Sequence, residues 1–242
     1  MEFYYKVKRL EINDKQIDFN LFDYDLHKKK QIHNEGLDII SNCIYKKGCW
    51  STLETELLIE IMKGGGHDFI DLGCHIGFFS VIANCYNNNV LAIDKNENFV
   101  SVLEETIEDN NLTNLTIKNM VIDENIGRKF FEKFDKIRCV KISLNGQEVG
   151  AINLFKNLLK EKKIDYLFIN FKKDVKGYIF LLKIIQKYGY KIYDLGIQQN
   201  IKYNEDTNHL KSINKYSLQN KNLKNYLNNL EFNETLLLLE KK

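Results

Sequence analysis

Two glycines four residues apart, Gly73 and Gly77, lie in the stretch DLGCHIG, directly after Asp71. A glycine turn that follows a β-strand is a common nucleotide-binding loop, because glycine allows the tight turn and the close approach of a ligand to the backbone. Asp94 lies about 20 residues beyond this loop, where an acidic side chain accepts hydrogen bonds from both hydroxyls of a ribose. This spacing predicts a site for a ligand that contains a nucleoside.

The residues between the two glycines narrow the choice of ligand. A dinucleotide fingerprint reads Gly-x-Gly-x-x-Gly, and its middle glycine lets the backbone meet a pyrophosphate. Here Cys74, His75 and Ile76 fill that space, and their bulk argues against NAD or FAD. S-adenosylmethionine contains a nucleoside and no pyrophosphate, so we expect it as the cofactor. Asn119 and Met120, which leave the third predicted strand, are expected to face the adenine.

The elements that must position these residues alternate along the chain. Short apolar runs typical of buried strands occur at 69–72, 90–94, 115–122, 165–171 and 190–195, with apolar residues at helical spacing between them. Such alternation indicates a mostly parallel sheet with helices on its faces. We therefore predict an α/β, Rossmann-like sheet whose last strand lies within 232–240. Two alternating segments that flank Asp135 and Lys136 predict a β-hairpin insertion.

The segment before the glycine loop divides into two parts. Residues 1–48 mix apolar alternation with polar runs, which predicts an N-terminal extension of one or two hairpins packed on the core. Residues 49–242 are expected to form the main domain. Ser51, followed three residues later by Glu54, has the pattern of a capping box at the start of a helix.

Composition excludes several classes of protein. The 35 basic and 33 acidic residues leave a formal charge of +2, so no basic face for nucleic acid is indicated. The five cysteines are spread without a Cys-x-x-Cys pair, which is typical of reduced thiols. We expect a soluble, cytoplasmic protein, because the chain has no signal-like start and no apolar run of ~18 residues. The spacing of histidines and acidic residues indicates no metal site.

The chain resembles the FkbM family of S-adenosylmethionine-dependent O-methyltransferases from about residue 38 to residue 119. The residues that carry the resemblance are found in the stretches GCWSTLETE, DLGCHIGFFSV, VLAID and NNLTN. They are Gly48, Trp50, Asp71, Gly73, His75, Gly77, Phe78, Asp94, Asn111 and Leu112. The resemblance implies a class I methyltransferase domain over residues 49–242. The cofactor-binding residues expected from it and from the loop are Asp71, Gly73, Cys74, His75, Gly77, Phe78, Asp94, Lys95, Asn119, Met120 and Asn170.

A later motif of that family, Lys-Ile-Asp-Val-Glu-Gly, is altered here to FINFKKDVKGY. Either Asn170 replaces the aspartate directly, or Asp174 matches it after a short insertion. We prefer the first alignment, because the strand ends best at Phe171. Candidate general bases near the strand ends are His75, Lys172 and Asp174. For His75 a structural hydrogen-bonding role is the alternative, and for the lysines around 172 a solvated face.

The resemblance implies methylation of a sugar hydroxyl, with a sugar or sugar nucleotide as substrate in the biosynthesis of a capsule or lipopolysaccharide. Methylation of an RNA 2′-hydroxyl is an alternative enzymatic function. It is disfavoured by Asn170, which stands where an acidic residue is expected, and by the balanced charge. A degenerate methyltransferase fold that serves as a binding or scaffold module is a further alternative, which the altered motif raises.

Overall fold

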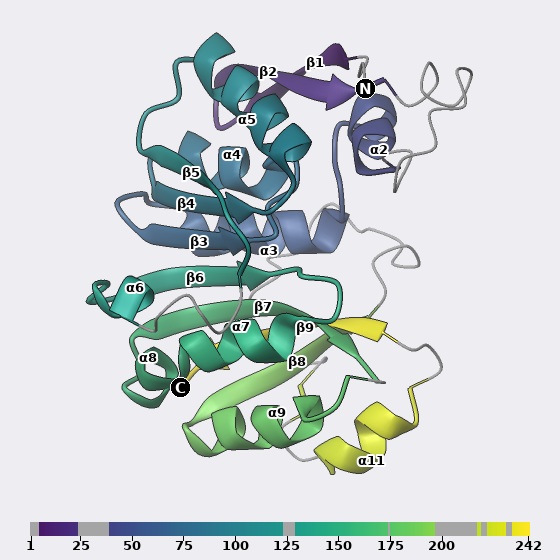
Figure 1. The fold of residues 1–242 in the computed structure, drawn as a ribbon, viewed down its shortest axis with the longest axis vertical. Helices are drawn as coiled ribbons and strands as arrows, with labels where there is room; N and C mark the ends of the chain where they lie inside the picture. The colour runs from purple at the N-terminus through teal and green to yellow at the C-terminus, as the bar shows by residue number, and fades with distance from the viewer. Residues whose placement is uncertain are drawn as a thin grey trace.

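A seven-stranded sheet forms the centre of the computed structural model, which describes residues 5–23, 39–122, 129–173, 175–196, 217–218, 222–230 and 234–242 (Figure 1). The strands follow the order β5-β4-β3-β6-β7-β9-β8 across the sheet. They are β3 (Asp68–Leu72), β4 (Asn89–Asp94), β5 (Leu115–Asn119), β6 (Ile137–Ile142), β7 (Ile164–Lys172), β8 (Tyr190–Gly196) and β9 (Glu234–Lys241). Only β9 is antiparallel to its neighbours among these strands. The predicted α/β, mostly parallel sheet is confirmed.

Helices cover both faces of the sheet. Successive strand residues point to opposite sides, so each buried strand contributes apolar side chains to both faces. Phe69 packs with α3 (Thr52–Met62), α4 (Phe78–Cys85) and α5 (Glu97–Asp109) in one apolar core. Ile70 packs in the other core, with α7 (Glu148–Leu154), α8 (Lys156–Lys160), α9 (Tyr178–Lys187) and α11 (Leu223–Asn228). Strand order reverses between β3 and β6, and ligands of open α/β sheets bind at the carboxyl ends of the strands beside such a reversal.

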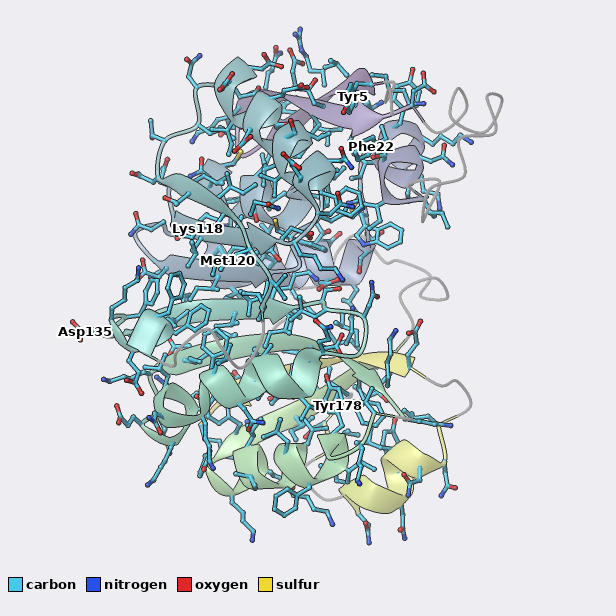
Figure 2. The ribbon with its side chains drawn as sticks, viewed as in Figure 1. Tyr5, Phe22, Lys118, Met120, Asp135 and Tyr178 are labelled. Atoms are coloured by element: carbon cyan, nitrogen blue, oxygen red, sulfur yellow. The ribbon has the colours of Figure 1, made fainter. Side chains whose placement is uncertain are left out.

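The N-terminal segment contains the predicted hairpin, β1 (Tyr5–Ile12) and β2 (Lys15–Phe22). Asn13 and Asp14 join the strands with positive φ at both positions, as a two-residue hairpin turn requires. Tyr5 and Phe22 lie opposite each other across the pair (Figure 2). The buried side of β2 packs on α5, where the Asn20 N–H donates to Thr106 Oγ1 at 3.1 Å. The division of the chain at residue 48 stays a prediction.

One helix of this segment was not expected from the sequence. Helix α2 (Ile39–Lys47) follows the hairpin and contacts β2; it lies beside the hairpin in Figure 1. Within the residues that the structure describes, no helix is long and apolar enough to span a membrane.

Two local predictions are wrong. The segment expected to form a hairpin insertion contains α6 (Lys129–Glu132) and β6, a central strand that pairs in parallel with β3 and β7. The charged residues Arg138 and Lys141 gave the sequence the pattern of a half-exposed strand. In the structure Arg138 donates to Ile61 O and to Asp165, and Lys141 is buried. The capping box is also absent. The Ser51 hydroxyl donates to the Glu54 carboxylate at 2.8 Å and makes no bond to the helix backbone.

Candidate functional site

A cavity of about 470 Å³ opens at the carboxyl ends of β3, β4 and β6. The glycine loop after β3 forms one wall, together with residues 93–96 at the end of β4. Ser143, Leu144, Asn145 and Gln147, which follow β6, form another part. Trp50 lines the cavity together with Ile39 and Ile40 of α2. The volume lies within the range of ~300–1,000 Å³ that is usual for sites of small ligands and cofactors.

The glycine loop is fixed by the backbone around it. Gly73 has φ of 76°, and a Cβ there would lie 2.0 Å from the Ser143 carbonyl oxygen. The Gly73 and Cys74 N–H groups both donate to the carbonyl oxygen of Ile93, at 2.8 and 3.1 Å. Gly77 also has φ of 76°, and a Cβ there would collide with the Leu103 side chain. The glycines are therefore needed to pack the loop against β6 and α5.

Asp94 is held in place by two backbone donors. The His75 N–H donates to Asp94 Oδ2 and the Asn96 N–H donates to Oδ1, both at 2.9 Å. The His75 ring lies against Phe99, with 3.9 Å between the ring centroids. Each carboxylate oxygen has a second lone pair, so the carboxylate has the capacity to accept two hydroxyl groups of a ribose as well. The predicted approach of the glycine loop to Asp94 is thus present in the fold.

Three buried charged side chains lie together at the cavity, and two of them line it. Asp71 of β3 and Lys141 of β6 are in register on neighbouring strands, and both line the cavity. Lys141 Nζ lies 3.4 Å from Glu54 Oε1 of α3. The Ser80 hydroxyl of α4 donates to Asp71 Oδ2 at 2.8 Å. We call Asp71, Lys141 and Glu54 the charged cluster.

The pKa of Asp71 is raised within the charged cluster. Burial raises the pKa of Asp71 to about 6, against the opposing effects of the Lys141 ammonium and the Ser80 hydroxyl. The carboxylates of Glu54 and Asp94 contribute to the increase. Within the described part of the chain, Asp71 Oδ1 is buried and has no hydrogen-bond partner. A buried acceptor without a partner, in a residue that lines a cavity, fits a cationic ligand group such as an ammonium.

A family model described as tellurite resistance protein TehB matches residues 51–221, more than half of the chain. The chain belongs to the TehB family. The resemblance of the sequence to the FkbM family is not confirmed by this match. No curated protein matches the chain in sequence.

Solved structures similar to this TehB-family chain include several methyltransferases. An rRNA methylase from Streptococcus thermophilus has a TM-score of 0.50 and 15% identity, over 78% of this chain and 94% of that one. A TehB-like S-adenosylmethionine-dependent methyltransferase from Corynebacterium glutamicum has a TM-score of 0.47 and 10% identity, over 90% of this chain and 98% of that one. TrmK from M. capricolum, in complex with S-adenosylhomocysteine, has a TM-score of 0.47 and 16% identity, over 78% of this chain and 68% of that one. The fold is that of class I methyltransferases, and S-adenosylmethionine is supported as the cofactor.

Most of the predicted cofactor residues of this TehB-family chain line the cavity. They are Asp71, Gly73, Cys74, His75, Phe78, Asp94, Lys95 and Met120. Cys74 is buried, and burial raises the pKa of its thiol well above the ordinary value. Gly77 lies at the N-cap of α4, directly behind the loop. Asn119 and Asn170 do not line the cavity. Asn119 Nδ2 donates to the Asp94 carbonyl oxygen, and Asn170 Nδ2 donates to Ser143 Oγ.

The two candidate bases that the structure describes, His75 and Lys172, are not brought together. His75 lines the cavity, and its backbone N–H positions Asp94. Lys172 is outside the cavity wall and forms an ion pair of 3.7 Å with Glu234 of β9. Asp174 lies outside the described residues. Sequence reasoning missed Lys141 as a cavity residue. A lysine inside an otherwise apolar strand, IRCVKI, was the available signal.

Proposed function

We propose that the protein transfers a methyl group from S-adenosylmethionine to a hydroxyl group of a small polar acceptor, and that this acceptor is a sugar. The observation that carries the proposal is the cavity at the reversal of strand order. It is lined by the glycine loop and Asp94 and also by Trp50 and the amide side chains of Asn145 and Gln147. Donor and acceptor would therefore meet within one site.

The residues present fit the cofactor. Asp94 would accept the ribose hydroxyls, and Met120 and Ile122 would pack against the adenine, since all three line the cavity. Asp71 Oδ1, buried and without a hydrogen-bond partner in the described chain, would accept from the ammonium of the methionine part. When bound, S-adenosylmethionine supplies a methyl group on a positively charged sulfur, which is already an activated leaving group.

The chain's own contribution is chiefly orientation. Holding the acceptor oxygen in line with the methyl group removes most of the entropic cost of the reaction. Ser143 and Asn145 line the cavity after β6, and their side chains would position the acceptor hydroxyl. His75 is the described candidate base in the cavity wall, whereas the ion pair with Glu234 gives Lys172 no support in that role. A general base within reach would add ~10²–10⁴ in rate.

An aromatic side chain beside amide groups favours a sugar as acceptor. A sugar ring presents apolar C–H faces to an aromatic ring such as Trp50, and hydroxyl groups to amides such as Asn145 and Gln147. The family description points to a second acceptor, an oxyanion of tellurium. Of the cavity-lining lysines, Lys141 lies 3.4 Å from the Glu54 carboxylate, so an anion gains little beside it. RNA stays the third candidate, since an rRNA methylase shares the fold.

Transfer of a labelled methyl group tests the proposal directly. The full chain and labelled S-adenosylmethionine would be incubated with sugar nucleotides, with RNA, and with tellurite in separate reactions. Label is expected in the sugar fraction, and Trp50→Ala should lower transfer while cofactor affinity changes little. Label only in RNA or in tellurium would replace the acceptor proposed here. Absence of calorimetric binding of S-adenosylmethionine at high micromolar concentration would refute the enzyme and leave the scaffold alternative.

We also propose, from the sequence alone, that residues 1–48 form an extension on the methyltransferase domain of residues 49–242. The cytoplasm is the proposed location, and assembly of a capsule or lipopolysaccharide the proposed setting.

A further inference from the structure

The charged cluster lies almost fully inside the protein. Asp71, Glu54 and Lys141 are exposed by only 1%, 4% and 6% of their surface. They come from three elements, β3, α3 and β6, and Lys141 Nζ also lies 4.8 Å from the centre of the Phe79 ring. Charges this deeply buried are weakly screened by solvent and salt. Their sum therefore acts on any charged group that enters the cavity.

With Asp71 ionised, two carboxylates and one ammonium give the charged cluster a net charge of −1. With Asp71 protonated, the cluster is neutral. The methyl donor carries a positive sulfonium, whereas the product left after transfer has a neutral thioether sulfur. A cluster of charge −1 attracts the donor more strongly than the product, and a neutral cluster does not make this distinction.

We propose, on the basis of the proposed function, that Glu54 and Lys141 determine the preference of the cavity for S-adenosylmethionine over S-adenosylhomocysteine through the charge of Asp71. Glu54 does not line the cavity, so it acts as a positioning residue through Lys141. Its carboxylate adds the second negative charge, which makes the cluster negative when Asp71 is ionised. The preference would help product leave after each turnover.

The groups around Asp71 set the pH at which this preference appears. Besides Glu54 and Lys141, the titratable groups near it are Asp94 of β4, Cys74 of the glycine loop and Cys139 of β6. Both thiols are buried, and burial raises their pKa well above the ordinary value, so they stay neutral. Because the pKa of Asp71 is raised to about 6, the preference for the donor should rise as pH increases through that value.

Calorimetric titration of the full chain with each of the two ligands, between pH 5 and pH 8, tests the proposal. The measured quantity is the ratio of the two Kd values, which cancels damage that weakens both ligands alike. In Glu54→Gln at pH 7.5 the preference for S-adenosylmethionine should fall about tenfold, since one buried unit charge is lost. Glu104→Gln, on the exposed side of α5, is the matched control and should keep the wild-type ratio.

Each outcome separates this inference from the proposed function. If neither ligand binds the wild-type chain, the proposed function fails. If both bind and Glu54→Gln keeps the wild-type ratio, the inference is overturned while the function stands. Should Glu54→Gln not fold, Lys141→Met gives a second measurement. Loss of the ammonium should move the rise of the ratio to higher pH, and an unchanged pH profile in that variant would overturn the inference.

Discussion

Replacement of Asp71 by asparagine should make the protein more stable at neutral pH. Asp71 is 1% exposed, and burial raises its pKa from 3.8 to about 6. Above that pH the folded state therefore holds a buried negative charge that destabilises it. At ~1.36 kcal/mol for each tenfold change in proton affinity, the difference between these two pKa values amounts to about 3 kcal/mol. Asparagine keeps the shape and the capacity to bond with Ser80 without the charge.

The sign of the pH dependence follows from the raised pKa. Between pH 3.8 and about 6 the folded state holds a proton that the unfolded chain has lost, so wild-type stability falls as pH rises through this window. The penalty is complete above about pH 6. Relative to Asp71→Asn, the wild-type chain should therefore lose about 2 kcal/mol of unfolding free energy between pH 4.5 and pH 7.5.

Urea denaturation followed by circular dichroism at five or six pH values measures this difference. Asp135→Asn is the matched control, because Asp135 is exposed and precedes β6, at the amino end of that strand (Figure 2). The Asp71→Asn difference should bend near pH 6, and the control should not show that bend. A difference between wild type and Asp71→Asn that stays flat from pH 4.5 to 7.5 would refute the burial argument.

Four further substitutions test the packing of the loops and the cofactor site. Gly73→Ala should lower the free energy of unfolding, measured by urea denaturation, by about 3 kcal/mol or more, because φ is positive and the new Cβ would meet Ser143. Gly150→Ala in α7, where the space around the residue is open, should instead raise it by ~0.5–1 kcal/mol. Glu148→Ala should lower the free energy of unfolding by about 2–4 kcal/mol in the same assay, since this buried carboxylate accepts hydrogen bonds from the N–H groups of Leu144 and Gly146. A loss below ~1 kcal/mol would contradict the stabilising role of these two bonds. Asp94→Asn should weaken calorimetric binding of S-adenosylmethionine about tenfold or more, and an unchanged Kd would argue against a ribose contact.

Strands with uniform apolar composition could be predicted from the sequence. The runs FIDL and VLAID form β3 and β4, because residues buried on both faces must be apolar along the whole strand. The same rule fails at β6. Arg138 and Lys141 are buried or half-buried there only because Asp165 and Glu54 lie beside them in the folded chain. No local pattern contains that information, so the strand was mistaken for half of a hairpin.

The candidate site divides in the same way. Gly73 and Asp94 were predicted as partners because the fold class alone places the loops after β3 and β4 side by side. The charged cluster depends on the register of Asp71 against Lys141 and on the turn of α3 that carries Glu54. Register between strands distant in the chain is a tertiary property and cannot be read from local sequence. The Ser51 to Glu54 spacing also offered a simpler local role for Glu54, as part of a capping box.

The position of β9 has a consequence for synthesis on the ribosome. β9 is inserted between β7 and β8, so the ladder that joins β8 to the sheet is made by residues 234–241. While those residues are still in the exit tunnel, β7 and β8 both lack their ladder with β9, and among the described residues β8 keeps only the bridge between Tyr193 and Ser217. An open, apolar edge is a template for association with other chains. The nascent protein is therefore exposed to aggregation until its last strand emerges, and a premature stop codon upstream of residue 234 would make that exposure permanent.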